Sequence, residues 1–257
     1  MQETMADIPT AAGRMDTFIT RPEARGPFPA VVIYMDIWGL REELFEIARR
    51  VATTGYVCLV PNFYYREGKV RYDTRNAHNK VVSVGSLDPA VRAVMLGSLK
   101  ALTNAMIVAD TGALLDFLAA DAGVSDGPLG GIGYCMGGRH VLCAATAFPD
   151  RFRAVASLHG TELVSDAPDA PHLKFGGLRG ELYCGFGAVD PHTKPPMVAR
   201  MSELLRPCPV DYRHEVHAGA DHGYALPDRD VYDSRAAARD WELIHAMFRR
   251  QIPAGAG

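Results

Sequence analysis

The residue with the clearest chemical potential is a cysteine between glycines. Cys135 lies in the stretch GYCMGG, with Gly133 two positions before it and Gly137 two positions after it. A nucleophile at a tight strand-to-helix turn needs small residues at both positions, because a Cβ there would clash with neighbouring backbone. The spacing predicts such a corner, with the thiol at a helix N-terminus where negative charge is favoured. A buried structural cysteine in a glycine-rich turn is the alternative.

Two other side chains could complete a catalytic set with Cys135. Asp190 directly follows an apolar, strand-like run, and His222 lies in the segment GADHGY after the last expected strand. Nucleophile, acid and histidine in this chain order is the order of the α/β-hydrolase triad. A turn or helix-capping aspartate is the alternative for Asp190, and His159 and His192 are the next candidates for the histidine.

No metal or other cofactor is expected. The chain has no HExxH, and its five cysteines lack the CxxC spacing of zinc ligands. Histidines and an aspartate between positions 190 and 222 leave a metal cluster open as an alternative. We expect reduced thiols, with three of the cysteines in the core: Cys58, Cys143 and Cys184.

The elements that must position these residues alternate along the chain. Residues 30–35 are a nearly continuous apolar run with three β-branched residues, as in a strand buried on both faces, and 41–53 and 56–61 continue as a helix and a parallel strand. The other expected elements are an opening edge strand at 14–20, a helix at 89–119 interrupted near 102–104, strands at 153–160, 182–190 and 210–217, a helix at 197–205 and a closing helix at 232–250. This pattern predicts one α/β domain over residues 1–257, with a mostly parallel central sheet and helices on both faces.

Composition excludes several classes of partner. The 257 residues are 48% hydrophobic and 22% charged, with a formal net charge of -3. No general basic face for nucleic acid is indicated, and no apolar run approaches the ~20 residues that span a bilayer. The start of the chain has neither the basic residues nor the apolar core of a signal peptide. We expect a cytoplasmic protein with a small-molecule substrate and with neither a nucleic-acid nor a membrane partner.

Residues 63–88 form a long polar connection of the kind that is often functional or mobile. Between positions 64 and 92, six basic residues stand against three acidic ones, opposite in sign to the whole chain: Arg66, Lys69, Arg71, Arg75, Lys80 and Arg92 against Glu67, Asp73 and Asp88. The cluster is interpreted either as a solvated surface or as a rim that attracts an anionic substrate.

These motifs together resemble the dienelactone hydrolase family, over about residues 15–250. The resemblance rests on MDIWG at 35–39, GIGYCMGG at 131–138, Asp190 and GADHGY at 219–224. It implies an α/β-hydrolase fold and a cysteine hydrolase that opens lactones or small esters. Cys135 would be the nucleophile, His222 the general base and then acid, and Asp190 the group that fixes the imidazole. The backbone N–H groups of Ile37 and Met136 would form the oxyanion hole.

The resemblance also implies further contacts in the site. Asp36 stands where the best-studied relatives have a glutamate that contacts the resting thiol; being one methylene shorter, it could instead cap the following helix. The family binds a substrate carboxylate through arginines, for which Arg92 and Arg229 are the candidates. Three aromatic residues could form apolar walls or simply pack in the interior: Trp38, Tyr64 and Tyr224.

A second class of function stays open from the sequence. The chain could be a thiol-based sensor or a ligand-binding pseudoenzyme, in which Cys135 is modified but acyl transfer is never completed. The natural substrate and the oligomeric state are not indicated by any motif.

Overall fold

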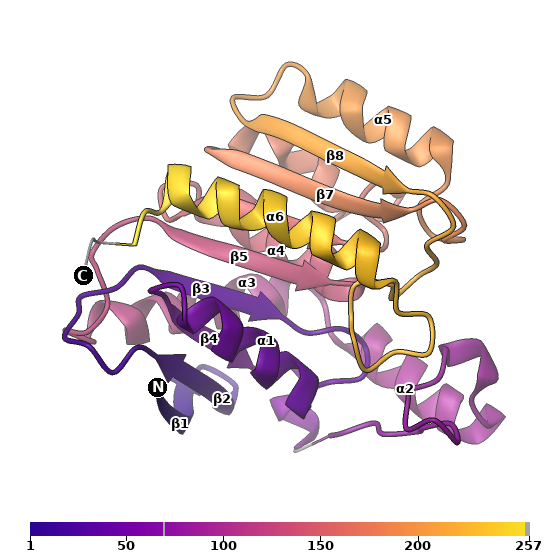
Figure 1. Ribbon diagram of the computed structural model, residues 1–257, viewed down its shortest axis with the longest axis horizontal. Coiled ribbons are helices and arrows are strands. Elements are labelled where there is room, and N and C mark those ends of the chain that lie inside the picture. The colour runs from indigo at the N-terminus through magenta and orange to yellow at the C-terminus, as the bar shows by residue number, and fades with distance from the viewer. Residues whose placement is uncertain (69, 255–257) are drawn as a thin grey trace.

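An eight-stranded sheet runs through the centre of the protein (Figure 1). The computed structural model describes residues 1–68 and 70–254. The strands are β1 (Gln2–Thr10), β2 (Gly13–Arg21), β3 (Ala30–Tyr34), β4 (Val57–Pro61), β5 (Leu129–Tyr134), β6 (Phe152–Leu158), β7 (Glu181–Gly187) and β8 (Asp211–His217). Their order across the sheet is β1-β2-β4-β3-β5-β6-β7-β8, and every neighbouring pair from β4 to β8 is parallel. The predicted mostly parallel sheet is confirmed.

The edge of the sheet differs from the sequence prediction. The strand expected at the edge, β2, is the second strand, because β1 pairs with it in an antiparallel hairpin and covers its outer side. In β1 only Ile8 is buried, so the apolar alternation that identifies a strand in the sequence is missing there. Backbone pairing with β2 holds this segment in place.

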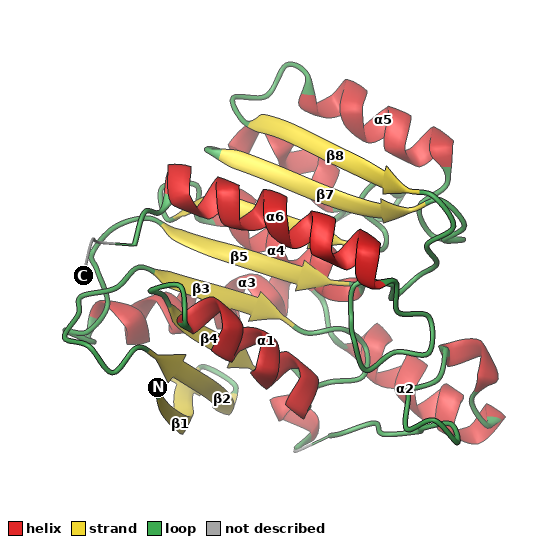
Figure 2. Ribbon diagram, viewed as in Figure 1, coloured by secondary structure: helices red, strands yellow, loops and turns green. Residues whose placement is uncertain are grey.

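Helices cover both faces of the sheet, as predicted. They are α1 (Glu42–Ala52), α2 (Pro89–Ala101), α3 (Asn104–Ala119), α4 (Met136–Ala147), α5 (Pro195–Leu205) and α6 (Ser234–Gln251), with short 3-10 helices η1 (Tyr65–Glu67), η2 (Val84–Ser86) and η3 (Pro171–Gly177). In Figure 2, α1 and α6 lie in front of the sheet, and α3 and α4 lie behind it.

Local capping explains the break that the sequence predicted near 102–104. The Asp88 side chain accepts hydrogen bonds from the amides of Ala90 and Val91 at the start of α2, and the Thr103 hydroxyl accepts one from the Met106 amide at the start of α3. Two consecutive N-caps define two helices, because each supplies partners for otherwise unpaired amides. The two helices bend by 68° at the break.

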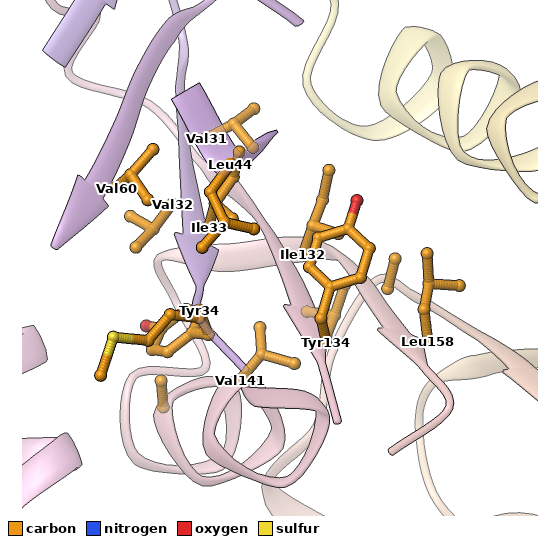
Figure 3. Close-up of a cluster of buried hydrophobic side chains, with 14 of the residues drawn as sticks. Val31, Val32, Ile33, Tyr34, Leu44, Val60, Ile132, Tyr134, Val141 and Leu158 are labelled. Carbon is orange, nitrogen blue, oxygen red and sulfur yellow. The ribbon is translucent and has the colours of Figure 1, made fainter. Parts of the chain in front are cut away.

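The core lies on both sides of β3 and β5. Figure 3 shows β3 residues Val31, Val32 and Ile33 packed among side chains from α1, β4, β5, α4 and β6. All three are fully buried, as expected for a central parallel strand. This packing fixes the ends of β3 and β5, and the loops that carry the candidate site leave from those ends.

Within the described part of the chain, no single helix has the length and hydropathy of a membrane span. The bent pair α2–α3 reaches the length and hydropathy of a span only when its two helices are counted together.

Candidate functional site

The turn between β5 and α4 carries Cys135 in a conformation that few residues adopt. Its φ is 56° and its ψ is -119°, which strains an L-residue. A Cβ at Gly133 would lie 2.0 Å from the Gly137 carbonyl oxygen, and one at Gly137 would lie 2.2 Å from the Tyr34 carbonyl oxygen. Only glycine fits at either position, so the strand-to-helix corner predicted from the spacing is confirmed.

Three side chains from three loops meet at the carboxyl ends of the strands. The Cys135 Sγ lies 3.1 Å from His222 Nε2, and His222 Nδ1 lies 2.9 Å from Asp190 Oδ2. Asp190 is buried after β7, and its other carboxylate oxygen accepts a hydrogen bond from the His192 amide at 2.8 Å. The arrangement can orient an imidazole between a carboxylate and a thiol, which is the geometry of an activated nucleophile.

The electrostatic surroundings of His222 favour the protonated form of its ring. Burial by itself lowers the pKa of His222, but the charge of the Cys135 sulfur and the hydrogen bond to Asp190 outweigh it and raise the pKa to about 10. An imidazole with so high a pKa retains a proton received from the thiol. The ring of His222 can therefore hold a proton at neutral pH.

Two backbone amides point to a possible oxyanion site. Ile37, in the turn after β3, and Met136, the first residue of α4, line the same cavity as Cys135. The N–H of a first helical residue has no partner in its own helix, and that of Ile37 has none among the described residues. The Tyr64 hydroxyl links the two residues by donating to the Ile37 carbonyl at 3.2 Å and to the Met136 sulfur at 3.5 Å.

Asp36 lies against an arginine rather than against the thiol. Its fully buried carboxylate accepts hydrogen bonds from Arg41 at 2.6 Å and 3.0 Å and from the Trp38 amide at 3.2 Å. Arg41 also pairs with Asp228 at 2.5 Å. No hydrogen bond joins Asp36 to Cys135 in the described part of the chain. A buried carboxylate needs a paired charge, and Arg41 supplies it from only five positions away.

The cavity beside Cys135 has a volume of about 350 Å³. Its floor includes Cys135, Met136 and His222, and its outer wall is built from residues 83–85 of the long polar connection and from Leu96 and Leu99 of α2. The connection is pinned to the segment after His222, because the Val81 amide donates to the Asp228 carbonyl at 2.8 Å. No sequence motif marks this wall, since residues 83–85 have no distinctive pattern.

The two candidate arginines lie in different environments. Arg229 is 4% exposed, lines the cavity, and has its guanidinium carbon 5.5 Å from the centre of the Trp38 ring. Its side chain makes no hydrogen bond or ion pair with any described residue. Arg92 is partly exposed on α2, outside the cavity lining.

The three aromatic residues expected as apolar walls are all buried, and none of them lines the cavity. Trp38 packs under Arg229, and Tyr64 holds Ile37 and Met136. The Tyr224 hydroxyl donates to Asp240 at 2.6 Å. Their positions match the packing alternative, because each contacts other buried side chains or backbone and none borders the cavity.

Most side chains of the basic cluster at 64–92 have partners, three of them acidic. Arg66 pairs with Asp110 at 2.7 Å, Arg71 with Asp16 at 3.1 Å, and Arg75 with Asp73 at 2.5 Å. Lys80 donates to the Pro227 carbonyl at 2.8 Å, and Lys69 lies outside the described residues. The contacts with Asp110, Asp16 and Pro227 bind the connection to the rest of the protein, while the Arg75–Asp73 pair lies within it. These contacts disfavour a rim that attracts anions.

One group of side chains could bind a cation. Asp190, His192 and His222 offer ligand atoms that lie within 4.8 Å of one another. In this structure Asp190 already bonds His222 at 2.9 Å. A cation there would compete with the proton that joins these two residues.

Comparisons with known proteins agree with this geometry. A model of the dienelactone hydrolase family matches residues 15–252. A Synechocystis protein named "Putative carboxymethylenebutenolidase" is 25% identical over 255 residues, covering 98% of both chains. Among solved structures, a "Putative Dienelactone Hydrolase" from Klebsiella pneumoniae has a TM-score of 0.81 at 23% identity, covering 97% of this chain and 98% of that one. A dienelactone hydrolase-like promiscuous phosphotriesterase from metagenomic libraries reaches 0.77 at 23% identity, with the same coverage.

The order of the strands and the residues at their carboxyl ends together indicate one class of enzyme. A mostly parallel sheet, with a nucleophile elbow after β5 and an acid and a histidine on later loops, is an α/β-hydrolase. With the match over residues 15–252, the chain belongs to the dienelactone hydrolase family and is a hydrolase of esters or lactones. The resemblance identified from the sequence is confirmed.

Proposed function

We propose that the chain hydrolyses a lactone or small ester through a Cys135–His222–Asp190 triad and a covalent acyl-enzyme. The observation that carries the proposal is the continuous contact from the Cys135 sulfur through His222 to Asp190, at 3.1 Å and 2.9 Å. The raised pKa of His222 supports a general-base role, because the ring can accept the thiol proton before attack.

In the acylation step, the Cys135 sulfur attacks the substrate carbonyl carbon, and the thiol proton resides on His222 Nε2. The amides of Ile37 and Met136 stabilise the oxyanion; such donors typically contribute about 3 kcal/mol each. The C–O bond breaks, and His222 gives its proton to the departing alkoxide. In a lactone that alcohol stays attached to the acyl group.

In the deacylation step, water attacks the thioester while His222 Nε2 takes its proton. The C–S bond breaks, the carboxylic acid leaves, and the proton returns to the sulfur. Asp190 keeps Nδ1 protonated in both steps, so that Nε2 is the nitrogen that faces the reaction.

The first test is turnover of p-nitrophenyl acetate and a simple lactone by Cys135→Ala and His222→Ala. Both variants should lose at least about 10³-fold in kcat, because members of a triad act as a unit. Cys143→Ala is the matched control, since Cys143 is a buried thiol on α4 outside the cavity, and it should keep full activity. Turnover retained in both triad variants would exclude the mechanism.

Intact mass separates hydrolysis from the sensor alternative. After brief exposure to the ester, a hydrolase releases product over many turnovers and returns to its original mass. A stoichiometric acyl adduct on Cys135 without further product would indicate a thiol that is modified but not turned over.

Arg229 supports an anionic substrate. A buried guanidinium with no ion pair among the described residues is costly unless a ligand or water satisfies it, and this one lines the cavity beside Cys135. A carboxylate on the substrate would match its planar donors. The substrate carboxylate would then be the ion-pair partner of Arg229.

A further inference from the structure

The turn after β6 holds the nucleophile by its peptide groups. The Cys135 N–H donates to the Leu158 carbonyl and to His159 Nδ1, both at 3.1 Å. The Cys135 carbonyl accepts from the Thr161 amide at 3.1 Å. These contacts surround a residue whose φ of 56° is strained. The strained backbone conformation of Cys135 is maintained because hydrogen bonds hold both its N–H and its carbonyl group.

His159 is the member of this turn that acts through its side chain. Its ring is fully buried, and its centre lies 5.1 Å from that of His222, edge to face. Because Nδ1 accepts from a backbone amide, the proton of the neutral ring lies on Nε2. Burial and the nearby His222 lower the pKa of His159 well below its usual value, so the ring keeps Nδ1 as an acceptor. His159 does not line the cavity.

We propose that His159 is a positioning residue for the Cys135–His222 pair: its Nδ1 holds the nucleophile's amide, and this hydrogen bond keeps the sulfur 3.1 Å from His222 Nε2. Its contribution to turnover rests on the function proposed above. Its contribution to thiolate formation does not, because alkylation of the thiol can be measured without any substrate.

The hydrogen bond from the Cys135 amide to His159 can be tested separately from the volume of the His159 ring. In His159→Asn the side-chain oxygen can take the place of Nδ1, and asparagine tolerates the positive φ of 40° found at this position. His159→Phe keeps a ring but has no acceptor, and His159→Ala has neither. The two variants without an acceptor differ in size, so one of them remains informative if the other does not fold.

The measurement is the rate of alkylation of Cys135 by iodoacetamide against pH, in a Cys208→Ser background. This background removes the one cysteine in the described chain that is not buried. With His159→Phe and His159→Ala, the midpoint of the profile should rise by about one pH unit, and alkylation at neutral pH should slow about tenfold, because fewer sulfurs are ionised. His159→Asn should keep the wild-type midpoint.

His140→Leu is the matched control, because His140 is equally buried but has no hydrogen-bond partner among the described residues. It should keep the wild-type profile. A wild-type midpoint in folded His159→Phe or His159→Ala, or an equal rise in His159→Asn, overturns the proposal.

Ester turnover gives the second readout. The variants without an acceptor should lower kcat and leave KM unchanged, since His159 does not touch the cavity. If wild type hydrolyses no ester while the alkylation midpoints still separate as expected, the proposed function fails and the role of His159 stands. If hydrolysis depends on Cys135 but the midpoints do not move, the role of His159 fails alone.

Discussion

At the scale of single residues, the site combines one satisfied and one unsatisfied arginine. Arg41 is buried between Asp36 and Asp228 and meets carboxylates on two sides. Arg229 is also buried, but its guanidinium lies over the Trp38 ring, lines the cavity and forms no ion pair with a described residue. The first arginine holds the loop after β3 against the loop after His222. If the second binds a substrate carboxylate, as proposed above, the two arginines should respond differently to substrate charge.

Arg229→Gln should therefore impair carboxylated substrates selectively. Losing a charged hydrogen-bond partner costs roughly 1.5–3 kcal/mol, so KM for mono-p-nitrophenyl succinate should rise about 10- to 100-fold. KM for p-nitrophenyl butyrate, which is neutral, should change less than about twofold.

Arg92→Gln serves as the control for general charge effects, because Arg92 lies outside the cavity lining. It should leave both KM values unchanged. An equal loss for the neutral and the carboxylated ester in Arg229→Gln would contradict a carboxylate subsite and indicate a structural role for Arg229.

At the scale of elements, the β5–α4 corner is held by close backbone contact. The amino end of α4 approaches the end of β3 so closely that Gly137 can carry no side chain. Tyr64, on the connection after β4, adds hydrogen bonds to Ile37 and Met136. Cys135 and the expected oxyanion amides are therefore fixed by the same three segments.

Gly133→Ala should damage both stability and reactivity. The new Cβ would lie 2.0 Å from the Gly137 carbonyl oxygen, so backbone must move. We expect a loss of more than about 2 kcal/mol in the free energy of unfolding by urea, together with slower alkylation of Cys135.

Gly97→Ala is the control for glycine replacement itself. Gly97 lies in α2, and a Cβ there meets nothing within 4 Å. Alanine should stabilise this helix by about 0.5–1 kcal/mol. Equal effects of the two substitutions would show that the close contact at Gly133 has no energetic importance.

At the scale of the whole molecule, one buried carboxylate ties distant elements together. Asp240 of α6 accepts hydrogen bonds at 2.6 Å from Tyr183 of β7, His217 of β8 and Tyr224. Tyr224 is two residues after His222. The closing helix therefore stabilises the loop that carries His222 as well as the sheet. A buried carboxylate that accepts three short hydrogen bonds is costly to leave unpaired.

The His217–Asp240 pair should make stability depend on pH. Burial lowers the pKa of His217, but the hydrogen bond and the charge of Asp240 outweigh it and raise the pKa. The native state therefore binds the His217 proton more tightly than the unfolded state. This stabilisation is complete below about pH 6.5 and is lost as pH rises through the raised pKa.

His217→Gln should remove this component. Between pH 6 and pH 9 the free energy of unfolding should fall by about 1 kcal/mol more in wild type than in the variant, since a hydrogen bond to a charged ring exceeds one to a neutral ring by that amount. Other titrating groups, His222 among them, are present in both proteins and cancel in the comparison. Parallel declines in the two proteins would contradict the prediction.

Much of the fold was predictable because its elements carry strong local signals. The buried strands β3 and β4 are continuous apolar runs, and β5 ends at the glycine-rich corner. The division between α2 and α3 follows from two capping residues, Asp88 and Thr103. β1 was missed because most of its side chains are exposed and it depends on its pairing with β2. The sequence signal fails where pairing with a neighbour, and not burial, defines an element.

The corner at Cys135 is encoded locally, since steric exclusion of a Cβ leaves glycines at fixed spacing along the chain. The sequence by itself also determined the chain order of Cys135, Asp190 and His222, and hence the family. Only the tertiary structure decided the partners of the charged groups: Asp36 with Arg41, Arg229 with no acid among the described residues, and His159 with the Cys135 amide. Those partners lie on loops that come into contact only once the sheet has formed, and no periodicity in the sequence predicts such contacts.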